Sequence, residues 1–210
     1  MTERLYYTSD ATQGQANIMS CLAEPDGRYA IMLDRTLFHP QGGGQPSDAG
    51  WIGDAAVQSV ITRGDAVVHI VDQALPLGEA LLRIDAATRQ YHARLHSAGH
   101  LIGMAGERYG WQPVKAHHWP GEGRITFAPG ESAVLPAAEA LLAIISAWQG
   151  EDLPRRITCE SGLRQVGFGE LPAYPCGGTH VARLSEIGDV TITQLKLKKG
   201  QMIVHYSLVP

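Results

Sequence analysis

Hydrophobic and polar positions alternate along the first third of the chain in short runs that end at turn residues. Tyr29-Ala30-Ile31-Met32-Leu33 is one such run, and two others flank Arg63-Gly64-Asp65 at a spacing typical of a β-hairpin. Short strands joined by glycine turns predict a small barrel-like β domain. The strands predicted here are 6–8, 29–33, 56–62 and 66–71.

From residue 80 onward, helix signals join the strand signals. Asp85 is a suitable N-cap for a helix over 86–109, which Gly110 would stop and which has Leu95 and Ile102 on its apolar side. A second helix is predicted over 135–149. Further strands are expected at 80–84, 124–127, 157–159 (with Cys159 in the core), 190–198 and 202–208.

Two helices against an antiparallel sheet make the second part α+β. The predicted fold class is therefore α+β, with a β-barrel-like domain over residues 1–80 and an α+β domain over residues 81–210. The 210 residues are enough to bury a sizeable core.

Composition is that of an ordinary soluble protein, with 44% hydrophobic and 18% charged residues. The N-terminus has no signal-peptide pattern, no apolar run approaches the roughly 20 residues of a membrane span, and three cysteines make no disulfide framework. We therefore expect a cytoplasmic protein without a membrane partner.

The net charge of −4 argues against binding nucleic acid by bulk charge. Local contact is still open, because Lys196, Lys198 and Lys199 cluster and Arg155-Arg156 form a second basic spot. A solvated strand face before a turn is the plainer explanation of the lysines.

Two separated segments carry residues that commonly bind metal. His96 and His100 lie four residues apart, so a helix would direct both from one face. Cys176 and His180 flank Gly177-Gly178, a pair that suits a tight loop. Three imidazoles and a thiolate favour zinc over magnesium or calcium. Either pair alone is weak evidence, but together they predict one shared zinc ion per chain.

One alternative and one ambiguity accompany this site. His92 also precedes His96 by four residues, but each such step drifts about 40° around a helix, so all three histidines are not expected at one ion. Four protein ligands would leave the zinc ion no open coordination position, as in structural sites. Ligands drawn from a helix and a distant loop instead suit a cleft, where zinc could support ester hydrolysis.

A glycine-rich segment interrupts the strands of the first part. Gly42-Gly43-Gly44-Gln45 allows positive φ angles and a close approach of another group. A flexible linker is the alternative, but Phe38, Pro40 and Pro46 bracket the segment, which favours a functional loop. It is not a Walker A loop, because the Gly-Lys-Ser/Thr ending is absent.

Three motifs in order resemble the editing domain of alanyl-tRNA synthetase and, more closely, the free-standing alanyl-tRNA editing (AlaX) family of medium length. They are Asp34-x-Thr36-x-Phe38-x-Pro40-x-Gly-Gly-Gly-Gln-Pro-x-Asp48-x-Gly50, Arg94-Leu95-His96-Ser97-Ala98-x-His100-Leu101 and Cys176-Gly-Gly-Thr-His-Val181. The resemblance covers nearly the whole chain. This sequence departs from the usual pattern at Ser97, His39 and Gln41, where the family more often has Thr, Tyr and Glu.

The resemblance implies hydrolysis of mischarged tRNA(Ala), chiefly Ser-tRNA(Ala), with Gly-tRNA(Ala) as a second candidate, at the acceptor end. It implies His96, His100, Cys176 and His180 as zinc ligands, and Thr36 and Gln45 as residues that discriminate the substrate. The Gly42–Gly44 backbone would line the pocket, and Lys196, Lys198 and Lys199 are candidates for phosphate contacts. A hydrolase of another acyl ester, or a tRNA-binding module with structural zinc, are the alternatives.

Overall fold

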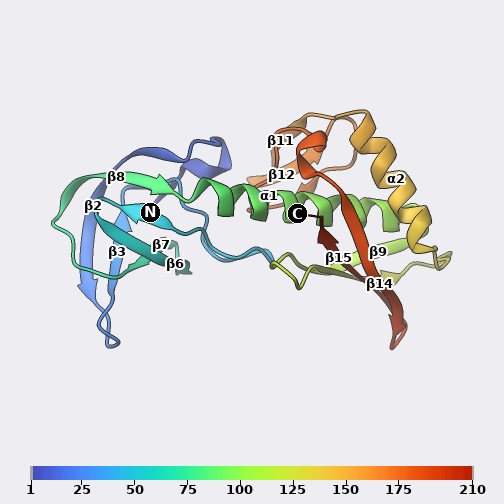
Figure 1. Ribbon diagram of the computed structural model, residues 1–210, viewed down its shortest axis with the longest axis horizontal. Helices are drawn as coiled ribbons and strands as arrows, with labels where there is room; N and C mark the ends of the chain where they lie inside the picture. The colour runs from blue at the N-terminus through green and yellow to red at the C-terminus, as the bar shows by residue number, and fades with distance from the viewer. Residues whose placement is uncertain (1, 210) are drawn as a thin grey trace. The chain divides into compact units, whose positions relative to one another are not determined.

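The computed structural model describes residues 2–209, which form two α-helices and mostly antiparallel sheets. The predicted α+β class is confirmed. The chain divides into two compact units (Figure 1). The barrel unit comprises the residues up to Gly42 together with Pro46–Tyr91, and the α+β unit comprises Gly43–Gln45 together with the residues from His92 onward.

Six antiparallel strands of the barrel unit close into a barrel in the order β2-β3-β7-β6-β5-β8. Side chains that alternate along these strands, such as Ile31, Ile52 and Leu82, are fully buried in its core. The predicted hairpin around Gly64 is confirmed as β6 and β7. The strands are β2 (Gln13–Ala23), β3 (Tyr29–Leu33), β5 (Gly50–Ile52), β6 (Ala55–Arg63), β7 (Ala66–Val71) and β8 (Gly78–Ile84).

The N-terminal segment before the barrel differs from the prediction. The strand predicted at 6–8 is wrong, because Leu5–Tyr7 form a 3-10 helix, η1. The backbone N–H groups of Thr8 and Ser9 both donate to the carbonyl of Leu5, and the turn buries Tyr6. Two short strands, β1 (Glu3–Arg4) and β4 (Arg35–Thr36), pair in parallel beside it.

The loop between β4 and β5, residues 37–49, is tied to the first turns of helix α1 (Ala86–Glu107). Arg89 Nε donates to Asp48 Oδ1 at 2.9 Å, its Nη2 also pairs with Asp48 Oδ2, and Nη2 donates to the Leu37 carbonyl at 2.7 Å. Asp48 in turn accepts from the backbone N–H of His39. Arg89 thus holds Leu37 and Asp48, which lie on either side of the glycine-rich segment, against the start of α1.

The same contacts explain why the units divide at Tyr91, not at the boundary of 80 that the sequence predicted. Strand β8 continues to Ile84 and pairs with both β2 and β5, so it belongs to the barrel. Asp85 then caps α1 as predicted, accepting from the Thr88 N–H and hydroxyl. The first turns of α1 stay in the barrel unit, where Arg89 binds Asp48.

In the α+β unit, one face of α1 packs on a four-stranded sheet of order β14-β15-β10-β9. Gly106 lies against the Phe127 ring and Tyr206 donates to the Leu95 carbonyl, so small helix residues allow close packing. A second sheet has the order β11-β12-β13. The elements are β9 (Trp111–His117), β10 (Arg124–Pro129), α2 (Ala138–Gly150), β11 (Arg155–Glu160), β12 (Leu163–Phe168), β13 (Tyr174–Pro175), η2 (Leu184–Ile187), β14 (Val190–Lys198) and β15 (Gln201–Leu208).

Two local predictions for this unit are corrected. Helix α2 begins at Ala138, not at 135. Leu135 precedes Pro136, and a residue before proline is disfavoured in helical conformation. Ala137 is still extended, with ψ of 150°. Cys159 is exposed, not in the core, because β11 is open to solvent along most of its length. The hairpin of β14 and β15 is confirmed.

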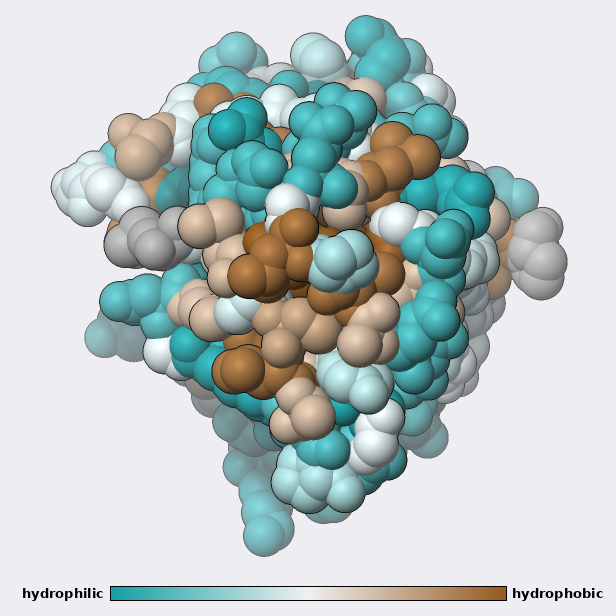
Figure 2. All heavy atoms as spheres, turned by 90° about the vertical axis from the view of Figure 1, so that its left-hand side faces the viewer, coloured by the Kyte–Doolittle hydropathy of each residue, from teal (hydrophilic) through white to brown (hydrophobic). Residues whose placement is uncertain are grey.

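Exposed apolar side chains are conspicuous on the barrel unit. Figure 2 shows hydrophobic side chains gathered on the face turned to the viewer. Met19, Leu22 and Leu81, on β2 and β8, are among the exposed large apolar residues of this unit. Within residues 2–209, neither helix is long and apolar enough to span a membrane.

Candidate metal centre

Four predicted ligand residues come together in the α+β unit. The ligand atoms of His96, His100, Cys176 and His180 all lie within 4.8 Å of one another. His96 and His100 project from one face of α1, while Cys176 and His180 come from the loop after β13. His92 is buried on the same helix but is not part of this cluster.

The spacing of the cluster suits a tetrahedral ion. Cys176 Sγ lies 3.5 Å from His96 Nε2 and 3.3 Å from His180 Nε2. Zinc bonds of about 2.0 Å to nitrogen and 2.3 Å to sulfur in a tetrahedron set a nitrogen–sulfur spacing of roughly 3.5 Å. The distances and the donor set therefore fit a zinc ion.

Burial determines the charge states of the cluster. Removal from solvent lowers the pKa of His100 to about 4 and the pKa of His180 well below its usual value, so both rings are neutral and can offer a lone pair. Burial also raises the pKa of the Cys176 thiol, opposed by the Gly178 N–H that lies 3.3 Å from Sγ. A bound cation would favour the thiolate.

Gln45 orients the first of these ligands. Its Nε2 donates to Thr179 Oγ1 at 2.8 Å and its Oε1 accepts from Thr179 N at 3.0 Å, which fixes the orientation of the amide. The same Oε1 lies 2.7 Å from His96 Nδ1, so that nitrogen must carry the ring proton. The lone pair of His96 is therefore on Nε2, facing Cys176.

Ser97 has a similar relationship with His180. Its hydroxyl oxygen lies 3.1 Å from His180 Nδ1 and accepts from the backbone N–H of Val181 at 3.2 Å. Both side chains are almost fully buried. A proton on Nδ1 directed at Ser97 leaves the His180 Nε2 lone pair on the side of Cys176.

Two arginines hold the backbone of the ligand loop. Arg164 Nη1 donates to the carbonyls of Cys176 at 2.7 Å and Gly178 at 3.1 Å, and Arg155 Nη1 donates to the carbonyl of His180 at 2.6 Å. No motif marks Arg164 in the sequence, because it lies in the ordinary strand β12. The sequence marks Arg155 only as part of a basic spot with Arg156.

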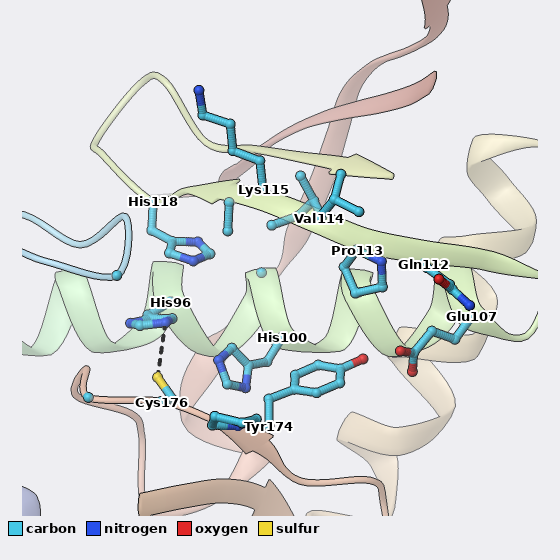
Figure 3. Close-up of a pocket in the computed structure, with 17 residues that line it drawn as sticks. His96, His100, Glu107, Gln112, Pro113, Val114, Lys115, His118, Tyr174 and Cys176 are labelled. Atoms are coloured by element: carbon cyan, nitrogen blue, oxygen red, sulfur yellow. Dashed lines mark hydrogen bonds between the residues drawn. The ribbon is translucent and has the colours of Figure 1, made fainter. Parts of the chain in front are cut away.

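The centre opens onto a cavity of about 590 Å³ within the α+β unit (Figure 3). One wall is the Gly99 and Gly103 face of α1, and Tyr174 lines the cavity next to His100. Glu107 and Gln112 lie at the end away from Cys176. The volume lies within the range of about 300–1,000 Å³ that is usual for small-molecule sites.

His118 also lines this cavity. Strand β9 ends at His117, and His118 follows it and is 1% exposed. Its ring stacks on His96 with a centroid distance of 4.3 Å (Figure 3). Burial lowers the pKa of His118 to about 3, so this ring is neutral.

The glycine-rich loop is divided between the units. Gly42 belongs to the barrel unit, whereas Gly43, Gly44 and Gln45 belong to the α+β unit and Gly43 lines the cavity. Gly44 has φ of 78°, and a Cβ there would lie 2.6 Å from the Ala116 carbonyl oxygen, so only glycine fits. The Gly44 carbonyl accepts from the His118 N–H at 2.8 Å, so this segment is not a free linker.

Thr36, the predicted reader of the substrate, lies inside the barrel unit and is 0% exposed. Its Oγ1 accepts from the Phe38 N–H at 3.0 Å and lies 2.8 Å from His69 Nε2. His69 Nδ1 lies 3.2 Å from the Ile31 carbonyl, to which it donates its proton, so the Thr36 hydroxyl donates to Nε2. Lys196, Lys198 and Lys199 lie on the exposed β14–β15 hairpin.

Comparison with known proteins agrees with this architecture. The family described as "Threonyl and Alanyl tRNA synthetase second additional domain" matches residues 163–203, which include the ligand loop. The alanyl-tRNA editing protein AlaX-M of Pyrococcus horikoshii is 30% identical over 96% of this chain and 93% of its own length. The chain belongs to the alanyl-tRNA editing protein family.

Longer members of this group share the same region. The alanyl-tRNA editing protein Aarsd1-B of Xenopus laevis is 40% identical over 82% of this chain, which spans 47% of that relative. The alanine–tRNA ligase of Methanocella arvoryzae is 24% identical over 89% of this chain, which spans 24% of the ligase. The AlaX-type architecture thus occurs both alone and as part of larger proteins.

Proposed function

We propose that this protein is a trans-editing hydrolase that deacylates mischarged tRNA(Ala), chiefly Ser-tRNA(Ala), with Gly-tRNA(Ala) as a second substrate. The observation that carries the proposal is a buried His96–His100–Cys176–His180 cluster that opens onto a cavity of about 590 Å³. The relationship to AlaX-M over nearly the whole chain supports tRNA as the partner.

The four residues of the cluster would hold one zinc ion. Bound zinc supplies a positive charge that polarises an ester carbonyl or lowers the pKa of water. This chain's own residues supply the rest: Gln45 and Ser97 direct the lone pairs of His96 and His180 toward Cys176. Such supports typically change metal affinity or activity 10- to 100-fold.

The cavity would receive the aminoacyl ester and the terminal nucleoside. Gly43 contributes backbone to its lining, where the absence of a side chain leaves room for substrate. We propose that Gly42, Gly43 and Gly44 bind the substrate through their backbone, and that Lys196, Lys198 and Lys199 contact phosphates of the acceptor arm. Phosphate contacts by a few lysines are compatible with an acidic protein.

Discrimination of serine from alanine depends on a single hydroxyl. A pocket that hydrogen-bonds this group can reject a substrate without it by about 10⁴-fold. We propose Thr36 and Gln45 as the discriminating residues. Thr36 has one remaining lone pair for this purpose, because its proton is directed at His69.

The test is deacylation of Ser-, Gly- and Ala-charged tRNA(Ala) by the wild type, Cys176→Ala and Thr36→Val. We expect rapid release of serine with Ala-tRNA spared, loss of activity with Cys176→Ala, and weaker discrimination with Thr36→Val. Thr36→Ser is the matched control, because it keeps the hydroxyl that His69 requires. No release from any substrate by the zinc-loaded wild type would refute the proposal.

The two other functions predict different results. A hydrolase of another acyl ester would cleave simple esters and leave Ser-tRNA(Ala) intact. A tRNA-binding module with structural zinc would bind tRNA without cleaving it, and Cys176→Ala would unfold the α+β unit.

A further inference from the structure

The cavity beside the metal centre has a polar end that the ligand cluster does not explain. Glu107 and Gln112 line the cavity, and Figure 3 shows both side chains at the end away from Cys176. Glu107 is the last residue of α1, whereas Gln112 is the second residue of β9, so two different elements contribute to this end. Both residues are exposed, which leaves their polar groups accessible to a bound molecule.

The fold does not use the amide of Gln112. Within residues 2–209 this side chain makes no hydrogen bond to another residue, although the backbone of Gln112 pairs with Ala128 in the sheet. The Glu107 carboxylate forms no ion pair in the same part of the chain, and its polar neighbour is the Tyr174 hydroxyl. A carboxylate can only accept hydrogen bonds, whereas an amide both donates and accepts. This end of the cavity therefore offers one kind of donor and several acceptors to a ligand.

The position of this end relative to the metal centre suits a nucleoside. His100, Gly103 and Glu107 lie on one face of α1, and the seven residues from His100 to Glu107 span about 10 Å. In an aminoacylated terminal nucleoside, the ribose separates the ester from the base. An ester at the metal centre therefore places the base toward Glu107 and Gln112.

The walls between the two ends are apolar and leave a narrow floor at Gly103. A Cβ at Gly103 would lie 3.6 Å from the Tyr174 ring and 3.7 Å from Pro113 Cγ, which is ordinary van der Waals contact. Val114 also lines the cavity and is 55% exposed. An aromatic ring and apolar side chains beside a bare stretch of helix suit the flat face of a base.

Adenine has the hydrogen-bonding groups that match the polar end. Its N7 accepts and its N6 amino group donates, and a glutamine amide binds N7 and N6 as a bidentate pair. The second hydrogen of N6 then remains for a group that only accepts, such as a carboxylate. A base without this amino group would leave two acceptors of the protein unpaired. The terminal nucleoside of every tRNA is adenosine.

We propose that Gln112 and Glu107 recognise the adenine of the terminal nucleoside. Gln112 Nε2 donates to N7 and its Oε1 accepts one N6 hydrogen, while Glu107 accepts the other. This assignment rests on the proposed function, because the ligand is the nucleoside that carries the ester. It makes the two residues specificity-determining for the substrate although they lie far from the reacting carbonyl.

The test measures the binding of seryl-nucleosides in which an amide replaces the ester, by calorimetry with the zinc-loaded protein. The adenosine form should bind about 10- to 100-fold more tightly than the purine riboside form, which lacks the N6 amino group. The 7-deazaadenosine form, which lacks only N7, should also bind the wild type more weakly. Gln112→Ala should bind the adenosine and 7-deazaadenosine forms equally, whereas Glu107→Ala should still distinguish them.

Two further variants check that the effect arises in the cavity. Glu131→Gln changes an exposed carboxylate outside the cavity lining and should bind the adenosine form as the wild type does. Gly103→Ala adds a methyl group between Tyr174 and Pro113, so it should weaken the binding of every form. Its melting temperature should equal or exceed that of the wild type, because alanine is the better helix former.

The outcomes separate this proposal from the proposed function. Equal affinity of the wild type for the adenosine and purine riboside forms, or tighter binding of a guanosine form, overturns adenine recognition even if Ser-tRNA(Ala) is hydrolysed. An N7 preference that persists in Gln112→Ala overturns the role of Gln112. Selective binding of the adenosine form that depends on both residues supports the site, and if no serine is then released from tRNA, only the proposed hydrolysis is refuted.

Discussion

Gln45 Oε1 lies 2.7 Å from Nδ1 of His96, and this contact leaves the lone pair of the histidine on Nε2, on the opposite side of the ring. Gln45 is 0% exposed and the same oxygen also accepts from the Thr179 N–H. One amide thus couples the glycine-rich loop to both segments that carry the ligands.

Replacing Gln45 should weaken metal binding. Gln45→Ala removes the acceptor of the His96 Nδ1 proton, so the ring can rotate or change tautomer, and zinc affinity should fall about 10- to 100-fold. Competition with a chromogenic chelator measures the affinity. Gln41→Ala, at an exposed position of the same loop, is the control and should bind zinc as the wild type does. Equal affinities for both variants would contradict the role of Gln45.

Ser97 should tolerate threonine but not alanine. Ser97→Ala leaves the buried His180 Nδ1 and Val181 N–H without their hydrogen-bond partner, which should cost about 1–3 kcal/mol of unfolding free energy. Ser97→Thr keeps the hydroxyl and should cost less. Urea denaturation of the zinc-loaded proteins gives both values, and the idea fails if alanine is the better tolerated residue.

The ion pair of Arg89 and Asp48 should be important for stability. Both side chains are almost completely buried, so Arg89→Met leaves an unpaired buried carboxylate and should destabilise the protein by about 3–5 kcal/mol. Arg35 pairs with Asp34 at 3.5 Å near the surface, so Arg35→Met should cost at most about 1 kcal/mol. Chemical denaturation of the two variants tests this difference; similar losses would argue against it.

His69 should make the protein less stable in acid. Burial lowers its pKa from 6.5 to about 4, so between these values the unfolded chain takes up a proton that the folded state excludes. The stabilisation is complete above pH 6.5 and is lost as the pH falls toward 4, by up to about 3 kcal/mol. The unfolding free energy of His69→Gln should fall less steeply over this interval. Parallel slopes for the two proteins would show that His69 does not contribute.

The lysines of the β14–β15 hairpin should affect tRNA binding and not the chemical step. Replacing Lys196, Lys198 and Lys199 by alanine should weaken tRNA binding at low salt. The slope of the logarithm of the binding constant against the logarithm of the salt concentration should become shallower by about 0.7–0.9 per lost phosphate contact. Binding titrations between low and moderate salt measure this slope. Arg28→Ala, which removes an exposed cation paired with Asp26, serves as the control. An unchanged slope would exclude the hairpin as a contact surface.

Features encoded locally were predictable from the sequence. The hairpin at Gly64, the cap at Asp85 and the ligand spacing of His96 and His100 depend on neighbouring residues, and the structure has all three. The donor chemistry of the two pairs predicts that they share one ion, and the structure brings their ligand atoms within 4.8 Å of one another. That they bind zinc stays a prediction.

Features that depend on distant contacts were missed. Gln45 reaches Thr179 across 134 positions, and no local pattern indicates that its amide orients a histidine. Arg164 lies in an ordinary strand, and its contacts with two loop carbonyls require the folded sheet. His117 and His118 are adjacent, and no local pattern indicates that only His118 is almost fully buried.

The assignment of Gly43–Gln45 to the α+β unit has a consequence for how this protein can be cut or fused. The unit that contains the ligands is not a continuous piece of chain, because three of its residues are encoded before the second half of the barrel. A fragment starting at His92 would keep all four ligand residues but lose the amide that orients His96 and the carbonyl that holds His118. A transplantable version of this centre therefore has to include both stretches of sequence.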